Sequence, residues 1–391
     1  MKNADLYTDI GYLSINHVGE LLCGDNVTVT DLSDGSHVVV LADGLGSGVK
    51  ANILSTLTST MMSKMVANDI DFEECVKTII ATLPICKDRG VAYSTFSIAF
   101  IKKNKQIVIY NYDNPSPFIV SHGKAFLPDY AVSMIEGKRI ERFEFEPELN
   151  DCLFMMSDGV IHAGAGEILN YGWELPEVMK YMAGVVMEDS SPKVLATTLV
   201  DRCNFLYDGK PGDDVTCACV KIRERSTVNL MIGPSTKPED DDKMVSAFMS
   251  KEGKHVVSGG TTASVVARCL DKEVQIENNE MNSDIPPMSH IEGLDLVTEG
   301  MITMNRVLEY GKNFAAKNDD YFNWYYKTDG ASRLASLLFE EASDVNIFSG
   351  CAVNPAHQNN TQLSISLKMK LVDELVNVLK KLKKNVTITY Y

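Results

Sequence analysis

Four short segments in the first part of the chain pair an aspartate with a glycine or with a second aspartate. They are Gly24-Asp25, Asp43-Gly44, Asp158-Gly159 and Gly212-Asp213-Asp214. Glycine at a strand end lets the backbone carbonyl approach a ligand, and the neighbouring carboxylate can project into a cleft. Oxygen ligands from several strand ends are what a hard divalent ion such as Mg²⁺ or Mn²⁺ requires. Two such ions about 4 Å apart can activate a shared water and hold phosphoryl oxygens.

Taken singly, each segment is better explained as a turn, because Asp and Gly are both common turn residues. Their placement favours the metal interpretation. Three of the four lie where an apolar run ends or begins, as in VVVLADG, CLFMMSDG and DDVTCACV. Such runs predict buried strands, so the carboxylates would stand at strand ends.

The elements that would position these carboxylates are strands interrupted by two groups of helices. A long helix follows Gly46-Ser47-Gly48 to about Asn68, and Asp71 is expected to begin a second helix that ends near Leu83. A further helical stretch covers Leu175–Leu206. This pattern predicts a β-sandwich flanked by helices. The predicted strands are Asn26–Asp31, His37–Ala42, Ser94–Ile101, Ile107–Tyr112, Pro117–Val120, Arg139–Phe145, Cys152–Ser157 and Asp214–Ile222.

The pattern changes after the polar joint Arg223–Thr227, so we expect one domain over residues 1–225 and another over 226–391. Strands and helices then alternate, which predicts a smaller α/β domain with a mostly parallel sheet. The predicted order is strand Val228–Ile232, helix Pro238–Ser250, strand His255–Ser258, helix Thr261–Leu270 and, at the end, helix Ile365–Leu382 and strand Val386–Tyr391.

One segment of the second domain has the form of a ligand site. Gly259, Gly260, Thr261 and Thr262 follow a predicted strand and open a helix, so their amides and hydroxyls could bind a small anion. The alternative is that Thr261 caps the helix and the glycines only make the turn. No Walker pattern is present. The polar segment Asn354–Asn359 is either a second ligand contact or a loop.

The composition and the lack of long apolar runs argue against several classes of function. The chain of 391 residues has a formal net charge of −16, which disfavours binding to nucleic acids and anionic membranes. It has neither a signal peptide nor an apolar run long enough to span a bilayer, so a cytoplasmic location is expected. Cys217 and Cys219 lack a second pair at zinc-ligand spacing and are interpreted as buried small hydrophobic residues.

Over residues 5–222 the chain resembles the SpoIIE-like branch of the metal-dependent, type 2C serine/threonine protein phosphatases. The resemblance lies in four segments in order: GELLCGD (Gly19–Asp25), LADGLGSGVKA (Leu41–Ala51), FMMSDGV (Phe154–Val160) and PGDDVTCACV (Pro211–Val220). It implies a four-layer α-β-β-α sandwich of the α+β class, with two Mn²⁺ or Mg²⁺ ions between the sheets.

The resemblance also implies a role for each aspartate. Asp43 would bridge both ions, and the Gly44 carbonyl and Asp25 would hold one of them. Asp158 and Asp213 would hold the other, and Asp214 would support the site.

The chain departs from the eukaryotic members of the superfamily at several positions. Leu45 and Leu21 stand where those members have a suspected general acid His and a phosphate-binding Arg. His162 is a candidate proton donor or an ordinary surface His. The segment Asp113–Pro117 stands where many relatives have Gly-His-Pro-Pro-Pro and is interpreted as a turn.

These observations favour a metal-dependent phosphatase that acts on phosphoserine or phosphothreonine of a bacterial signalling protein, regulated by the C-terminal domain. A small anionic ligand of that domain and a homodimer are further expectations. The alternative is a catalytically silent sensor or scaffold with the same fold. A third reading, in which the C-terminal domain is itself an enzyme, has no catalytic constellation in its support.

Overall fold

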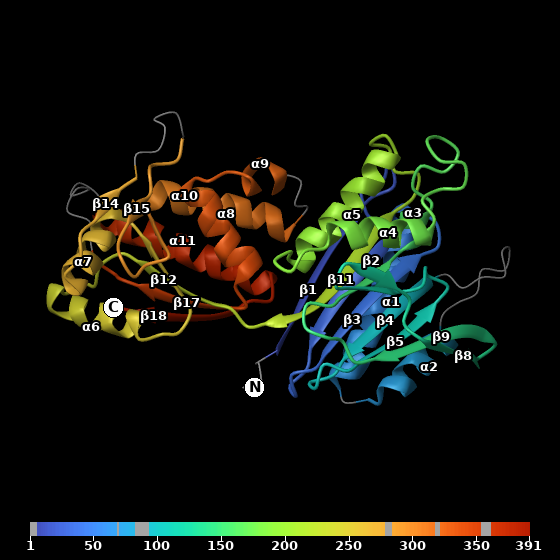
Figure 1. Cartoon of the computed structure of the whole chain (residues 1–391). Coiled ribbons are helices and arrows are strands. Elements are labelled where there is room, and N and C mark those ends of the chain that lie inside the picture. The colour runs from blue at the N-terminus through green and yellow to red at the C-terminus, as the bar shows by residue number, and fades with distance from the viewer. Residues whose placement is uncertain (1–5, 69, 83–93, 278–283, 317–320, 353–360) are drawn as a thin grey trace. The chain divides into compact units, whose positions relative to one another are not determined.

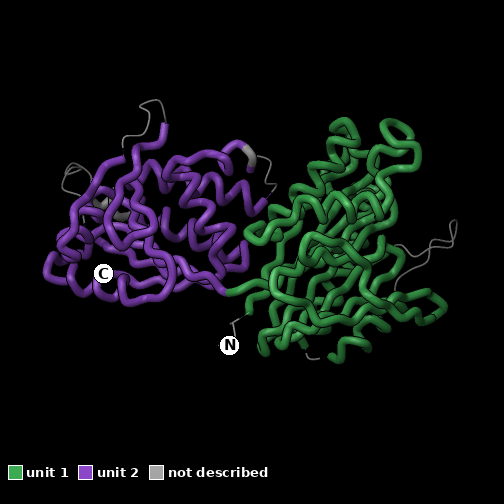
Figure 2. Tube along the Cα trace, viewed as in Figure 1, with its two compact units in different colours: residues 1–224 green, residues 225–391 purple. Residues whose placement is uncertain are grey.

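The structure, a computed structural model, describes residues 6–68, 70–82, 94–277, 284–316, 321–352 and 361–391. The chain divides into two compact units, residues 1–224 and 225–391 (Figure 2). The division falls within the polar joint at residues 223–227. Among the described helices, none is both long and apolar enough to cross a lipid bilayer.

The first unit contains a six-stranded antiparallel sheet (Figure 1). In spatial order its strands are β2 (Asp25–Asp31), β3 (His37–Gly44), β4 (Ser94–Ile101), β5 (Ile107–Tyr112), β9 (Lys138–Phe145) and β8 (Tyr130–Ile135). Helices α1 (Gly48–Ala67) and α2 (Phe72–Thr82) cover one face, where Val38 and Val40 of β3 pack in one cluster with Met62 and Ile79. Asp71 caps α2 as predicted, since it accepts the Glu73 N–H at 3.0 Å.

A five-stranded antiparallel sheet forms the other half of this unit. Its order is β1 (Leu6–Ile15), β11 (Val215–Glu224), β10 (Cys152–Met156), β6 (Phe118–Ser121) and β7 (Lys124–Phe126). The short helix α3 (Asp158–Ile161) follows β10, and α4 (Leu175–Val185) and α5 (Pro192–Leu206) cover the outer face. Cys217 and Cys219 are fully buried in this layer, which confirms their interpretation as core residues.

The inner faces of the two sheets meet in a third apolar cluster. Val39 and Leu41 of β3 pack there with Leu153, Met155 and Val220 of the other sheet. Alternate residues of β3 therefore face the helices on one side and the second sheet on the other, as strand geometry requires. The predicted four-layer α-β-β-α sandwich is confirmed.

The second unit has a seven-stranded sheet in which five neighbouring strands are parallel, as predicted. The parallel strands are, in spatial order, β16 (Leu296–Thr298), β13 (Lys254–Ser258), β12 (Thr227–Ile232), β17 (Asp344–Ser349) and β18 (Asn385–Tyr390). The short antiparallel strands β15 (Ser289–His290) and β14 (Gln275–Ile276) extend the edge beside β16.

Helices cover both faces of this sheet (Figure 1). The helices are α6 (Asp241–Met249), α7 (Gly260–Leu270), α8 (Met301–Ala315), α9 (Tyr321–Tyr325), α10 (Gly330–Ala335) and α11 (Thr361–Lys381), with a 3₁₀ turn at Pro238–Asp240 and a π-helical turn at Ser336–Glu341. Numbered along the chain, the parallel strands lie in the order 3-2-1-4-5, with β12 first. That order defines a doubly wound sheet whose direction of winding reverses between β12 and β17.

Candidate metal centre

Asp25 and Asp43 are brought together by the pairing of two antiparallel strands. Asp25 is the first residue of β2, and its register partner on β3 is Asp43. The backbone is tightly packed here, because a Cβ on Gly44 would lie 2.1 Å from the Ala51 carbonyl oxygen of α1. Only glycine lets this strand end pass so close to the helix, which is the physical reason for the Asp-Gly pair.

The second sheet supplies the other carboxylates from its corresponding strand ends. Asp158 follows β10, and Asp213 and Asp214 precede β11. Ser157 joins the two segments, since its N–H donates to the Thr216 carbonyl at 3.0 Å and its Oγ accepts the Thr216 N–H at 2.9 Å. A Cβ on Gly159 would lie 2.1 Å from the Asp214 carbonyl oxygen, so this glycine is also required for close approach.

The aspartates of the two sheets lie close together, because a Cβ on Gly24, beside Asp25, would be 2.6 Å from Oδ2 of Asp214. Burial, together with the charges of Asp214 and Asp158, raises the pKa of Asp25 to about 7, although the hydroxyls of Ser157 and Thr216 oppose the shift. Burial also raises the pKa of Asp43 well above its usual value, with added repulsion from Asp25, Asp158 and Asp213.

The pKa of Asp213 is also raised by burial and by neighbouring negative charge. It rises to about 6, first through burial and then through the charge of Asp158. The structure therefore brings together all five predicted aspartates, two from one sheet and three from the other, with the Gly44 backbone beside them.

The carboxylate oxygens fit a role as cation ligands. Among the described residues, neither oxygen of Asp25 nor Oδ2 of Asp214 makes a hydrogen bond of normal geometry, and all three atoms are buried. The hydroxyls of Ser157 and Thr216 lie near Asp25 and favour its charged form, but they do not complete its coordination. Buried anionic oxygens without such hydrogen bonds are costly unless a cation compensates them. Asp214 has a second task as well, because its Oδ1 accepts the backbone N–H of His17 at 3.0 Å.

The ligand set is not closed in this structure. Over the described part of the chain, no three His, Cys, Asp or Glu side chains approach one another closely enough to enclose a metal ion. Like charges oppose such an approach, so the set would close only around the cations themselves.

The neighbouring predicted residues have distinct positions. His162 ends α3 and is exposed, and its charge lowers the pKa of Asp213, so it lies near the carboxylates. Leu21 is 92% exposed and offers no group that could bind phosphate. The segment at residues 113–117 does turn the chain, with Asp113 at φ 59°, and it also lines a cleft.

In the second unit, the predicted ligand segment joins the ends of two parallel strands. Gly259 has φ 118°, α7 begins at Gly260, and Thr262 Oγ1 accepts the Gly233 N–H at 2.9 Å. The Glu299 carboxylate lies beside Gly260, since a Cβ there would be 3.2 Å from Oε1. The N-terminus of α7 therefore already faces an anionic group of the chain. The segment Asn354–Asn359 lies outside the described residues.

Comparison with known proteins supports the assignment of the first unit. Residues 33–223 match the family model described as stage II sporulation protein E (SpoIIE). The chain is 23% identical to stage II sporulation protein E of Bacillus subtilis over 208 residues, which cover 52% of this chain and 24% of that protein. It is 24% identical to the Priestia megaterium protein of the same name over 224 residues, which cover 56% of this chain and 37% of that protein.

The chain thus spans 24% and 37% of the length of these two curated relatives. Among solved structures, the phosphatase domain of SpoIIE from Bacillus subtilis aligns with a TM-score of 0.43 and 21% identity, covering 57% of this chain and 96% of that domain. The family match agrees with the motifs over residues 5–222. Residues 33–223 of this chain therefore carry a domain that matches the SpoIIE family model.

Proposed function

We propose that the first unit is a metal-dependent phosphatase that hydrolyses phosphoserine or phosphothreonine on a protein substrate. The observation that carries this proposal is the convergence of five aspartates from two sheets, with three buried oxygens that make no hydrogen bond of normal geometry among the described residues. The family match of residues 33–223 gives independent support.

Each residue has a task in this proposal. Asp43 would be shared between two divalent ions, the Gly44 carbonyl and Asp25 would hold one, and Asp158 and Asp213 would hold the other. The ions would supply an activated water and stabilise charge on the phosphoryl group. Asp214 accepts the backbone N–H of His17 and so holds that segment beside the site. His162 is exposed beside Asp213 and could protonate the leaving oxygen.

The test is hydrolysis of a phosphoserine peptide by the full chain with Mn²⁺ or Mg²⁺. We expect turnover that requires the metal and disappears in Asp43→Asn. Calorimetric titration of Mn²⁺ into the metal-free protein would give about two ions per chain. A protein that binds Mn²⁺ normally but turns over neither a peptide nor p-nitrophenyl phosphate would not be the enzyme proposed here.

The aspartates do not enclose a metal ion in this structure, so a protein without phosphatase activity is an alternative that should be tested. A silent sensor or scaffold would keep the fold without enclosing metal, and no closed ligand set is present among the described residues. Under that alternative, calorimetry would detect no Mn²⁺ binding at micromolar protein concentration. The phosphatase proposal requires binding that Asp25→Asn and Asp158→Asn each weaken by at least tenfold.

We also propose that the second unit binds a small anionic ligand and regulates the first. Ligands of doubly wound sheets bind beyond the carboxyl ends of the strands, at the point where the winding reverses. Here that point lies between β12 and β17, each followed directly by a glycine, Gly233 and Gly350. The Lys368 ammonium is near both, because it donates to the Gly350 carbonyl and would contact a Cβ on Gly233.

A second observation supports a ligand at this end of the sheet. The Ser349 hydroxyl, at the end of β17, is buried and has no hydrogen-bond partner among the described residues. Thermal unfolding with inorganic phosphate or sulfate as the probe tests the proposal. Stabilisation should be lost in Lys368→Gln and kept in Lys370→Gln, which changes a 73% exposed lysine on the same helix. Equal behaviour of both variants would contradict it.

A further inference from the structure

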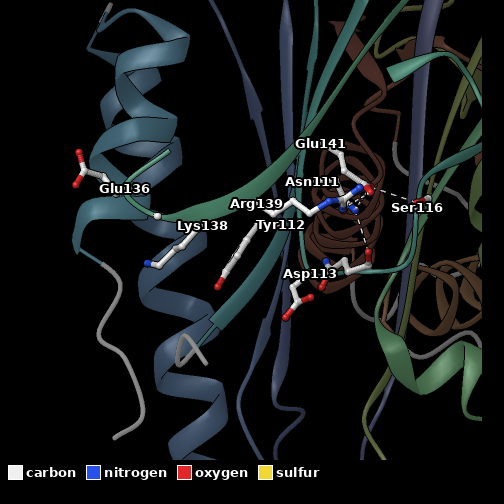
Figure 3. Close-up of a pocket in the computed structure, with 10 residues that line it drawn as sticks. Asn111, Tyr112, Asp113, Ser116, Glu136, Lys138, Arg139 and Glu141 are labelled. Atoms are coloured by element: carbon white, nitrogen blue, oxygen red, sulfur yellow. Dashed lines mark hydrogen bonds and ion pairs between the residues drawn. The ribbon is translucent and has the colours of Figure 1, made fainter. Parts of the chain in front are cut away.

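A polar cleft of about 420 Å³ lies at one end of the six-stranded sheet (Figure 3). It is formed where β5 ends and β9 begins, with the loop at residues 113–116 on one side and the turn Glu136-Gly137 on the other. Its volume is within the range of pockets that bind small ligands or single side chains. No part of the phosphatase mechanism above uses this cleft.

The floor of the cleft is a connected set of buried hydrogen bonds. Asn111, only 2% exposed, donates to the Asn114 carbonyl at 2.9 Å and to Glu141 Oε2 at 3.3 Å. Ser116 also donates to Glu141 Oε2, at 3.3 Å. Glu141 is 9% exposed, so its charge needs these partners and a cation. The network fixes the carboxylate rigidly in place.

Arg139 is the cation that compensates Glu141. Its NH1 donates to Glu141 Oε1 at 2.6 Å, yet its side chain is 56% exposed. In Figure 3 the Arg139 side chain extends toward Asn111 and Glu141. A guanidinium has five donors in a rigid plane, so one held by a buried carboxylate on one side can bind a second carboxylate on the other.

The cleft and the metal centre share the same end of the sheet. Thr95 on β4 is the register partner of Asp43 on β3. Its Oγ1 donates a hydrogen bond to Oδ1 of Asn114, at 2.5 Å. Strands β3, β4, β5 and β9 are consecutive neighbours in the sheet, so Asp43 and Arg139 are three strand spacings apart. At about 4.8 Å per spacing, the separation is roughly 14 Å, which four residues of extended peptide cover.

We propose that this cleft binds an acidic side chain of the protein substrate, about four residues from the phosphorylated residue, with Arg139 as its anchor. The inference rests on the proposed phosphatase function and adds a determinant of substrate choice. A net charge of −16 repels acidic segments, so their recognition needs a local cation of this kind.

The other charged groups of the cleft are less suited to this task. Lys138 donates to the Ile80 carbonyl at 2.6 Å and lies over the Tyr112 ring, 5.8 Å from its centre. Asp113 and Glu136 are exposed at the rim, where water screens their repulsion, and Glu136 lies beyond Lys138 from Arg139 (Figure 3). Arg139 is therefore the group best placed to bind an anion.

The test compares phosphoserine peptides of eleven residues that carry Glu, Gln or Lys four positions before or after the phosphoserine. With Mn²⁺ and the full chain, we expect a three- to tenfold higher kcat/KM for Glu than for Gln at one of the two positions. Arg139→Gln should bring the Glu peptide down to the Gln value, and Arg139→Lys should restore part of the difference. Arg142→Gln, a change on the same strand at a residue paired with Glu144, should keep the preference.

A second substrate distinguishes failure of the cleft proposal from failure of the phosphatase proposal. Turnover of p-nitrophenyl phosphate reports on the metal centre alone, because that substrate has no flanking residues. Normal turnover of it with no preference among the peptides, or a preference for Lys, would overturn the proposed role of the cleft. An Arg139→Gln variant that loses activity on all peptides equally would also overturn it. If the wild type turns over nothing, fluorescence anisotropy with labelled Glu and Gln peptides tests the cleft directly.

Discussion

Asp25 and Asp43 are register partners on neighbouring antiparallel strands, so two carboxylates that are 18 positions apart face each other across β2 and β3. Asp25 is only 4% exposed, and neither of its oxygens makes a hydrogen bond of normal geometry among the described residues. This pair concentrates negative charge where the second sheet adds three further aspartates. The arrangement destabilises the protein unless cations bind, and several measurable effects result from it.

Removing one of these charges should stabilise the metal-free protein. In Asp25→Asn, the amide can donate to the neighbouring carboxylates, and the buried charge disappears. We expect the variant to unfold in EDTA at a temperature several degrees above the wild type, a gain of about 1–3 kcal/mol. With saturating Mn²⁺ the order should reverse, because only the wild type gains binding energy. Differential scanning calorimetry of both proteins checks this, and a less stable variant in EDTA would contradict it.

The stability of the metal-free protein should fall as pH rises. The pKa of Asp25 is about 7 in the folded state and 3.8 as its ordinary value, so the folded protein holds a proton that the unfolded chain releases. The stabilisation is complete below about pH 3.8 and is lost as pH rises through 7. Asp213, with a pKa of about 6, changes in the same direction.

Urea unfolding in EDTA between pH 5 and 8 measures this dependence. The slope should be smaller in Asp25→Asn, where one of the titrating groups is absent. Saturating Mn²⁺ should abolish the loss at high pH, because the ions bind the deprotonated carboxylates. Stability that rises with pH in EDTA would show that these aspartates are not buried as the structure has them.

Gly44 should tolerate no side chain. A Cβ there would lie 2.1 Å from the Ala51 carbonyl oxygen, so Gly44→Ala must displace the end of β3 or the start of α1. We expect a loss of at least 1–3 kcal/mol in stability, together with weaker Mn²⁺ binding. Gly184→Ala is the matched control, because a Cβ on that helical glycine meets nothing within 4 Å. Equal stability of the two variants would refute the close packing.

The sequence predicts well those parts of the fold that depend on local pattern. The strands Ser94–Ile101 and Ile107–Tyr112 have the predicted bounds, since continuous apolar runs with clear ends specify buried strands. The five aspartates were also identifiable, because each lies in a segment with a glycine, and a Cβ on Gly24, Gly44 or Gly159 would clash with its neighbours. The pattern predicts no helix over Met301–Ala315, where α8 forms, and no strand over Tyr130–Ile135, an exposed edge strand.

The polar cleft could not be predicted from local pattern. Asn111 and Glu141 are 30 positions apart and meet only because β5 and β9 pair in that register. Arg139 and Glu141 belong to the strand sequence KRIERFEF, a mixture of charged and apolar residues, so nothing distinguishes them in the sequence. The segment at residues 113–117 was correctly predicted as a turn, but its place in the cleft depends on hydrogen bonds with residues from β4, β5 and β9.

The most direct test of the account is hydrolysis of a phosphoserine peptide by the full chain with at least two equivalents of Mn²⁺, in parallel with Asp43→Asn. We predict turnover that depends on Mn²⁺ and falls by at least a hundredfold in the variant, because in our proposal Asp43 would contribute to the binding of both ions. Equal turnover by both proteins, or turnover that persists in EDTA, would contradict the assignment of these aspartates as the catalytic metal centre.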